Sequence, residues 1–357
     1  MRLEKSLPSH IPEQIALYQT EHLLTQAVCR FDPVRAASYL RAHRNVMALD
    51  IGGDKLRCAT YAIGDGKLTK LEERVLRSTK GTGYLPFLDR LAAEAVAKDL
   101  PVGISSATKL AGSIIQRTVN LPVFFEEFRE RYGADYENLF PGRSFVCNDT
   151  IAGICGSSTI VVLQGHAVRD VAFFICASGM GASVLKDHTS IHVEAGHVPV
   201  VDRLNPLGQT RQCGVEGKDY VCVERVTAAR AGIEELYRQQ TGKARDGITL
   251  GKMYAAGDAL ATILYETSAR AIAHAAEGVM DRYEFADSET SVAVFHGGNF
   301  EIEKYRDTVR NNLTRLTRPR SRVVFSRDLS DNVCLDGAAI LAVYSDEPDS
   351  RVDESGH

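Results

Sequence analysis

The chain has 357 residues, of which 25% are charged, and a formal net charge of −4 at pH 7. This length is enough for two domains, and the slightly acidic balance gives no reason to expect a nucleic-acid or membrane partner. No apolar run approaches the roughly 20 residues of a membrane-spanning helix, and the N-terminus lacks a signal-peptide pattern. The eight cysteines lie mostly in apolar, strand-like runs, which is typical of reduced thiols. We therefore expect a cytoplasmic protein.

The first 44 residues precede the first predicted strand. Apolar residues recur at helical spacing between positions 11 and 29, and a second helix is predicted over 33–43. The segment is shorter and less basic than a DNA-reading winged-helix domain. We predict a helical extension over residues 1–44 that packs on the body or on a second subunit.

Strands and helices then follow in an order typical of α/β proteins. Strands are predicted at 46–76 (two or three), 100–105, 145–147, 171–176, 292–295 and 322–325, and helices at 86–98, 121–132, 223–240, 250–255, 259–282 and 335–344. Glycine turns near residues 52 and 297 follow similar strands, which indicates two related lobes with a cleft between them. We predict a smaller lobe over 45–147, joined by the last helix at 335–346, and a larger lobe over 148–334.

The first glycine turn lies in residues 50–55, which read Asp-Ile-Gly-Gly-Asp-Lys between two strand-like runs. Because glycine has no Cβ, backbone N–H groups at such a turn can approach phosphate oxygens closely. Asp50 beside the turn is well placed to meet Mg²⁺, which binds proteins through one or two carboxylates. An ordinary β-turn with a solvated Asp explains the segment equally well.

Asn148 and Asp149 follow a predicted strand and precede a run of small residues. Ligands of α/β proteins bind at such strand ends, where a carboxylate can take a proton from a hydroxyl group that an amide orients. Both residue types are also favoured helix N-caps, and the pair alone fits that alternative.

A second strand–turn–strand pattern occurs at 177–181, where the Ser178 hydroxyl and backbone amides could hold phosphate oxygens. A plain glycine hairpin is the alternative. Further along, Glu194 and His197 could bind adjacent sugar hydroxyls, or the histidine could bind a metal. With Cys213 and Cys222, His197 gives three ligands, one short of a closed zinc site. The irregular spacing makes zinc doubtful.

Taken in order, these motifs resemble those of the ROK family (repressors, open reading frames and sugar kinases), in the actin-like ATPase superfamily. The first hairpin of that family reads Asp-Ile-Gly-Gly-Thr-Lys, which residues 50–55 match except at Asp54. Its other motifs are an Asn-Asp pair, a Gly-Thr-Gly-x-Gly turn, a Glu-x-Gly-His sequence, a Gly-Gly element and a Gly-Ala helix; they correspond to 148–149, 177–181, 194–197, 297–298 and 337–338. The resemblance spans about residues 46–344 and implies two actin-like (ribonuclease H-like) lobes.

The resemblance also implies residue roles. Asp149 would be the general base, and Asp50 would help to place Mg²⁺. The implied sugar ligands are Asn120, Asn148, Asp149, Glu194, His197 and Glu224. The implied ATP-binding residues are Gly52, Gly53, Lys55, Ser178 and Gly179 at the phosphates, with Gly297 and Gly298 bordering the adenosine.

Three departures from the family pattern stand out. Asp54 replaces a threonine near the expected phosphates, and Ser106 and Ala107 replace a Pro-Gly loop. The zinc motif of the family, approximately Cys-x-Cys-Gly-x-x-Gly-Cys-x-Glu, lacks its middle cysteine in residues 213–224. At most a vestigial site of His197, Cys213 and Cys222 remains, so we expect no structural zinc. The altered loop indicates a substrate other than plain glucose, such as an amino sugar, a deoxy sugar or a cyclitol.

The sequence therefore predicts an ATP- and Mg²⁺-dependent kinase that phosphorylates a hydroxyl group of a hexose, an amino sugar or a cyclitol. Its expected partners are that small molecule and a second copy of the chain in a homodimer, without nucleic acid or membrane. The alternative is a sugar-binding regulator or a catalytically silent protein of the same fold.

Overall fold

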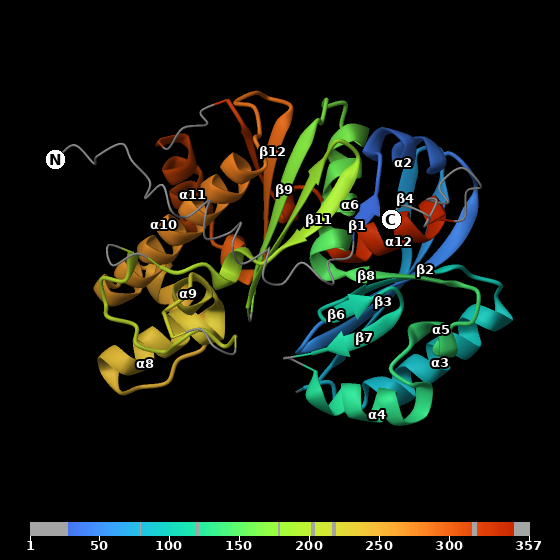
Figure 1. Cartoon of the computed structure of the whole chain (residues 1–357), viewed down its shortest axis with the longest axis horizontal. Helices are drawn as coiled ribbons and strands as arrows, with labels where there is room; N and C mark the ends of the chain where they lie inside the picture. Colours follow the sequence, from blue (N-terminus) through green and yellow to red (C-terminus); the bar gives the residue numbers. More distant parts are fainter. Residues whose placement is uncertain are drawn as a thin grey trace. The chain divides into compact units, whose positions relative to one another are not determined.

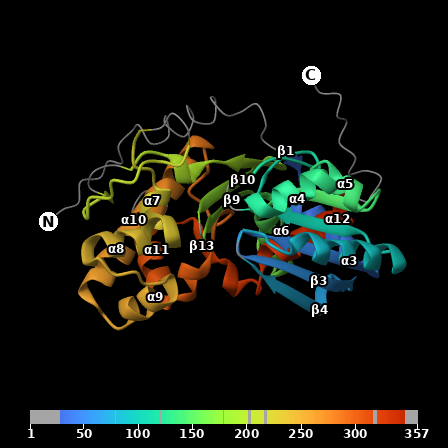
Figure 2. The ribbon, with the colours of Figure 1, turned by 90° about the horizontal axis from the view of Figure 1, so that it is seen from below.

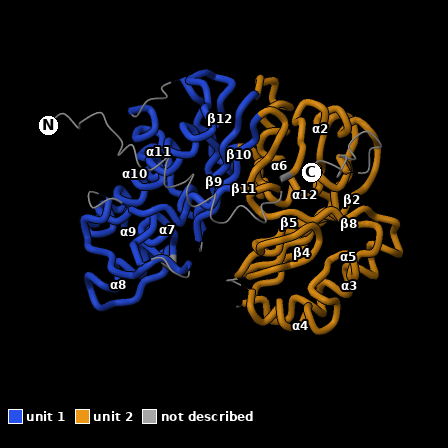
Figure 3. Tube along the Cα trace, in the orientation of Figure 1, with its two compact units in different colours: residues 1–24, 169–186, 193–328 blue, residues 25–168, 187–192, 329–357 orange. Residues whose placement is uncertain are grey.

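The computed structural model describes residues 28–78, 80–118, 121–177, 179–200, 204–215, 219–315 and 320–345. It separates into two compact units, which Figure 3 shows in different colours. Unit 1 contains Arg169–Lys186 and Val193–Asp328. Unit 2 contains the described residues between 28 and 168, Asp187–His192, and those between 329 and 345.

A five-stranded sheet forms the centre of unit 2 (Figure 1). Its strands, in spatial order, are β4 (Lys67–Arg77), β3 (Lys55–Gly64), β2 (Arg44–Ile51), β5 (Val102–Ser106) and β8 (Ser144–Asn148). β2 pairs antiparallel with β3 and parallel with β5, which pairs parallel with β8. All five residues of β5 are buried, as expected of a parallel strand covered on both faces.

The other elements of unit 2 are helices and short hairpins. The helices are α2 (Pro33–Tyr39), α3 (Tyr84–Ala97), α4 (Pro122–Tyr132), α5 (Tyr136–Leu139), α6 (Asp149–Leu163) and α12 (Val333–Ser345). The short strands are β1 (Val28–Arg30), paired antiparallel with β11 (Thr189–Val193), and β6 (Lys109–Ala111), paired with β7 (Ile114–Arg117).

Helices α6 and α12 pack with their backbones almost in contact. A Cβ on Gly337 of α12 would lie 1.8 Å from the carbonyl oxygen of Ala152 in α6, and one on Gly156 would lie 2.2 Å from that of Val333. On β5, a Cβ on Gly103 would lie 1.8 Å from the carbonyl oxygen of Ala338. Glycine is therefore required at these places because only a residue without a side chain allows such an approach.

Unit 1 is built on β10 (Met180–Lys186), β9 (Asp170–Cys176), β12 (Ser291–His296) and β13 (Arg322–Phe325), which lie in that spatial order. β9 pairs antiparallel with β10 and parallel with β12, and β12 pairs parallel with β13. Figure 2 shows the helices of this unit from below. They are α7 (Glu224–Thr227), α8 (Glu235–Thr241), α9 (Gly247–Ala255), α10 (Ala259–Arg282) and α11 (Glu303–Arg315), with a π-helix at Ala229–Glu234.

The two units repeat one strand pattern. An antiparallel hairpin is followed across the sheet by two parallel strands in β3-β2-β5-β8 and again in β10-β9-β12-β13. The predicted α/β class is thereby confirmed. The hairpin that corresponds to the first glycine turn is β9–β10. The Gly297–Gly298 segment instead follows β12, which corresponds to β5.

Most predicted elements appear within a few residues of their expected limits, but two differ. Residues 28–30 form the strand β1 and not the end of a helix, because they pair with β11. The predicted helix 223–240 is interrupted by the π-helix between α7 and α8. Residues 1–27 lie outside the described residues, and the lobe limits 45–147 and 148–334 stay a prediction. No helix in the described ranges is both long and apolar enough to cross a bilayer.

Candidate active site

Asn148 and Asp149 lie where β8 meets α6. Asn148 is the N-cap of α6, and its Oδ1 accepts the N–H of Thr150 at 2.9 Å. Asp149 is the first residue of the helix, and its Oδ1 accepts the same N–H at 2.9 Å. Both side chains are half-buried. The capping alternative therefore holds for Asn148, while Asp149 lies in the first turn, where the positive end of the helix dipole favours a carboxylate.

Asp50 lies near the end of β2, at the same end of the parallel strands as Asn148. The strand register pairs Asp50 with Ser105 and Ser106 with Asn148, so β5 separates the two. Oδ1 of Asp50 accepts the hydroxyl of Ser105 at 3.1 Å, and Oδ2 accepts Nδ2 of Asn332 at 2.9 Å. Asn332 also accepts the N–H groups of Cys334 and Leu335, at the start of α12. Two uncharged side chains thus orient the carboxylate without neutralising it.

The turn at Gly52 and Gly53 closes the hairpin after Asp50. The N–H of Gly52 donates to the carbonyl of Lys55 at 2.9 Å, and the Tyr84 hydroxyl donates to the carbonyl of Gly52 at 3.1 Å. The carbonyl of Asp54 accepts the N–H of Ser78. Partial burial and two nearby arginines lower the pKa of Lys55.

The second turn, between β9 and β10, lies in unit 1. Ser178 is outside the described residues, but the N–H of Ala177 donates to the carbonyl of Gly179 at 2.9 Å. Oε2 of Glu224, at the start of α7, accepts the N–H of Met180 at 3.0 Å. Glu224, expected as a sugar ligand, therefore contacts the backbone of the turn. This hydrogen bond, from the N–H of Met180 to the carboxylate of Glu224, fixes the backbone where the turn ends.

Gly196 and Gly297 pack against the same hairpin. A Cβ on Gly196 would lie 2.3 Å from the carbonyl oxygen of Met180, so the Glu-x-Gly-His motif lies directly on the turn. Gly297 has a φ of 135°, and a Cβ there would lie 1.9 Å from the carbonyl oxygen of Cys176. Both glycines are required by close backbone approach, which places residues 194–197 and 297–298 beside the predicted phosphate turn.

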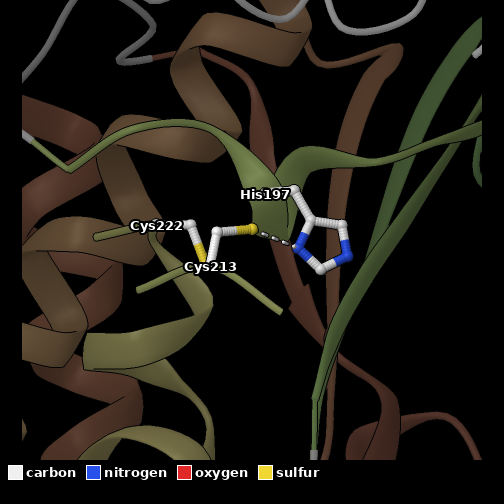
Figure 4. A group of neighbouring side chains, drawn as sticks. All are labelled: His197, Cys213 and Cys222. Carbon is white, nitrogen blue, oxygen red and sulfur yellow. Dashed lines mark hydrogen bonds between the residues drawn. The ribbon is translucent and has the colours of Figure 1, made fainter. Parts of the chain in front are cut away.

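His197, Cys213 and Cys222 form a cluster in unit 1. Figure 4 shows the three side chains together. One ligand atom from each lies within 4.8 Å of the other two. Sγ of Cys213 lies 3.4 Å from Nδ1 of His197, and Nε2 of His197 lies 3.8 Å from Oε2 of Glu194. The sequence left these three residues as a doubtful metal site, and the fold brings them together.

The side chains of this cluster change one another's pKa values. Burial acts to lower the pKa of His197, but the hydrogen bond with Cys213 and the carboxylate of Glu194 outweigh it, so this pKa lies above the usual value of 6.5. A hydrogen bond with Cys222 holds the pKa of Cys213 well below the ordinary value for a thiol, and the same bond raises the pKa of Cys222. A thiolate beside an imidazole is a typical donor set for zinc.

Sequence reasoning missed four residues that shape the site. Asn332 could have been found as a polar residue before a helical run, which is an N-cap signal. Ser105, Thr150 and His192 gave no signal, because their roles arise only from contacts between distant segments. Asn120, expected as a sugar ligand, lies outside the described residues.

Comparisons with known proteins give the family and the fold of the chain. The model of the ROK family matches residues 145–344, which is more than half of the chain. No curated protein sequence matches the chain. Among solved structures, a ROK hexokinase from Thermus thermophilus is 20% identical, with a TM-score of 0.58, over 83% of this chain and 97% of that chain.

Two further structures are similar. A ROK family glucokinase from Streptomyces griseus, solved with glucose and AMPPNP, is 20% identical with a TM-score of 0.57, over 84% of this chain and 99% of that chain. A ROK family transcriptional regulator, a homologue of the E. coli MLC protein, is 17% identical with a TM-score of 0.56, over 84% and 79%. At these identities the likeness shows the fold, which confirms the predicted actin-like class. The chain belongs to the ROK family.

Proposed function

We propose that this protein transfers the terminal phosphoryl group of ATP to a hydroxyl group of a sugar or sugar-like polyol. The observation that carries the proposal is the placement of Asp149, a half-buried carboxylate in the first turn of α6, next to the amide of Asn148. The family and the kinases of similar fold support it. The proposed acceptors are hexoses, amino sugars and cyclitols.

Asp149 would act as the general base. Phosphoryl transfer requires little covalent help from a protein, so positioning, charge neutralisation and a base on the nucleophile make up most of the catalysis. The bond from the Thr150 N–H to Oδ1 holds the carboxylate in place. Asn148 Nδ2 donates one hydrogen to the carbonyl of Thr108 at 3.2 Å. Within the described ranges, no acceptor takes its second amide hydrogen, which could donate to the accepting sugar hydroxyl.

ATP would bring Mg²⁺ with it. Asp50 suits that cation because its two hydrogen-bond donors, Ser105 and Asn332, are uncharged and fix the direction of the carboxylate. Mg²⁺ keeps most of its waters and requires only one or two carboxylates; it would neutralise charge on the phosphates. The turns at Gly52–Gly53 and around Gly179 would hold the phosphate oxygens, with Lys55 nearby. Gly297 and Gly298 would border the adenosine.

A zinc ion would have its own site in unit 1, apart from the proposed chemistry. His197, Cys213 and Cys222 fit the ion as three ligands, with the thiolate and imidazole character that zinc favours. The described residues supply no fourth ligand to this cluster. Zinc there would tie the loop that carries Cys213 to His197 and so support the sugar ligands. The phosphoryl transfer proposed above does not depend on it.

A second candidate function is sugar-responsive regulation without catalysis. It is favoured by the similar fold of a transcriptional regulator and by Asp54, which puts a negative charge where the family has a threonine. Retention of Asp50, Asn148 and Asp149 favours the kinase.

The test is ADP release from Mg-ATP across hexoses, N-acetylhexosamines, amino sugars and cyclitols. We expect turnover on one of these classes and a fall in kcat of at least about 100-fold in Asp149→Asn, because a general base contributes roughly 100- to 10,000-fold. The matched control is Asp258→Asn, which makes the same change at the N-cap of α10. If Asp149→Asn kept most of its turnover, Asp149 would not be the base. No turnover, together with thermal stabilisation by one of the sugars, would instead establish a sugar binder.

A further inference from the structure

The hydroxyl of Thr150 lies between the proposed substrate-binding amide and a histidine from a distant strand. Oγ1 of Thr150 donates to Oδ1 of Asn148 at 2.8 Å and lies 2.9 Å from Nδ1 of His192. His192 belongs to β11, and Thr150 is 1% exposed. All three residues are in unit 2. Neither the hydroxyl of Thr150 nor the imidazole of His192 has a part in the chemistry proposed above.

Counting protons fixes the direction of this chain of hydrogen bonds. A threonine hydroxyl has one hydrogen, and here it goes to Asn148. The contact with His192 must then run the other way, with Nδ1–H of the imidazole as donor. Nδ1 of His192 therefore carries a hydrogen. Its bond to the Thr150 hydroxyl keeps that hydroxyl directed at Oδ1 of Asn148.

The same count fixes which way the Asn148 amide faces. Its Oδ1 accepts both the N–H and the hydroxyl of Thr150, at 2.9 Å and 2.8 Å, so both lone pairs are used. Turning the amide over would set its NH₂ group against these two donors. The NH₂ group is thus directed away from Thr150, with one hydrogen on the carbonyl of Thr108.

Capping of the helix does not account for this arrangement. An N-cap requires one bond from the side chain to a backbone N–H of the first turn, and the Thr150 N–H already supplies it. The buried hydroxyl and the imidazole add two further hydrogen bonds whose common effect is to prevent rotation of one amide. A restraint of this kind is useful where the amide must meet a substrate in one orientation.

We propose that His192 and Thr150 are positioning residues that hold the Asn148 amide with its NH₂ group toward the accepting sugar hydroxyl, beside Asp149. This inference rests on the proposed function of the same site. It makes the efficiency of sugar use depend on a hydroxyl and an imidazole that touch neither sugar nor ATP.

The experiment is steady-state kinetics of Thr150→Val, Thr150→Ser and His192→Ala with the sugar that the wild-type protein phosphorylates. Valine keeps the shape of threonine but has no hydroxyl, so we expect kcat/KM for the sugar to fall about tenfold, the equivalent of one lost hydrogen bond, while KM for ATP is unchanged. His192→Ala should cause a similar loss. Serine restores the hydroxyl and should recover most of the activity lost in Thr150→Val.

His166→Ala is the matched control, because His166 is exposed and, among the described residues, is hydrogen-bonded only through its backbone N–H. A merely structural role would lower the melting temperature without separating the two KM values. If Thr150→Val and His192→Ala, folded by melting temperature, kept kcat/KM for the sugar within about twofold of wild type, the inference would be wrong. Because both Thr150→Val and His192→Ala are measured, the test remains decisive if one of these variants does not fold.

Failure of the proposed function would look different. If the wild-type protein releases no ADP with any sugar, the kinase proposal fails, and thermal stabilisation by the sugar becomes the readout. Loss of that stabilisation in Thr150→Val, but not in Thr150→Ser, would still support positioning of Asn148. Equal stabilisation of all variants, or of none including wild type, would overturn it.

Discussion

The two glycine turns occupy matching places in the two units but are stabilised differently. After β2, the turn at Gly52–Gly53 follows Asp50. Both carboxylate oxygens of Asp50 accept hydrogen bonds, one from a side chain of β5 and one from a side chain just before α12. After β9, the position that matches Asp50 in the strand register is Ile175, and the carboxylate comes from Glu224 on α7 instead. That carboxylate accepts a backbone N–H of the turn itself.

The carboxylate beside each turn therefore has a different structural role in the two units. In unit 2, uncharged side chains orient the carboxylate of Asp50 by hydrogen bonds, so its negative charge remains available for a cation. In unit 1 the acid accepts the N–H of Met180 and fixes the backbone, while close glycine packing at Gly196 and Gly297 shapes the surroundings. On the proposed function, the first turn would serve a metal-bound phosphate, and the second would hold phosphate oxygens through its backbone.

The largest effect is expected from Asp50. Asp50→Asn keeps an acceptor for Ser105 but removes the charge, so we expect kcat with Mg-ATP to fall by roughly 100-fold or more, as for other single electrostatic groups at reacting phosphates. The measurement is ADP release over a range of Mg²⁺ concentrations. Asp54→Asn removes the same charge from the same hairpin and serves as control. An equal loss in both variants would mean that the charge of the hairpin matters and not the orientation of Asp50.

A smaller effect is expected from Glu224. Glutamine keeps an oxygen that can accept the N–H of Met180, whereas alanine leaves this N–H without its partner. We therefore expect Glu224→Ala to raise KM for ATP about tenfold, from the loss of one charge-assisted bond, and Glu224→Gln to raise it far less. The two KM values, for ATP and for sugar, decide the outcome. A rise in KM for the sugar in both variants would instead support the predicted role of Glu224 as a sugar ligand.

The smallest effect on turnover is expected from the cluster behind the second turn. Three protein ligands hold zinc less firmly than four, so dialysis against a chelator should remove any zinc from His197, Cys213 and Cys222. Zinc requires the neutral imidazole, and the raised pKa of His197 favours the protonated one in the metal-free protein. Loss of zinc should thus begin at a pH above 6.5 as the pH is lowered.

Zinc content per chain, measured before and after dialysis at several pH values, checks this expectation, with Cys213→Ser as the variant without the site. One zinc per chain retained through dialysis would contradict it. Such retention would mean that the cluster has a fourth ligand.

The sequence predicts the fold well where patterns are local. The apolar runs of β5 and β9, the spacing in α10 and the polar pair at 148–149 each carry their own signal, so the strand end with Asp149 is found from its residues alone. Resemblance to the family adds the roles. What it cannot supply are contacts between distant segments: Asn332 on Asp50, His192 on Thr150, and Glu224 on Met180. The π-helix after α7 also has no pattern of its own, because tertiary packing decides it.

The glycine contact between α6 and α12 has a consequence for motion. Asp149 begins one of these helices, and Asn332, which holds Asp50, precedes the other. With their backbones in contact at Gly156 and Gly337, the helices cannot slide or tilt against each other without a clash. The proposed base and the proposed metal-binding carboxylate should thus move as one rigid block on every timescale short of unfolding. Amide hydrogens in the turns of both helices around Gly156 and Gly337 would then show one common free energy of opening in hydrogen exchange.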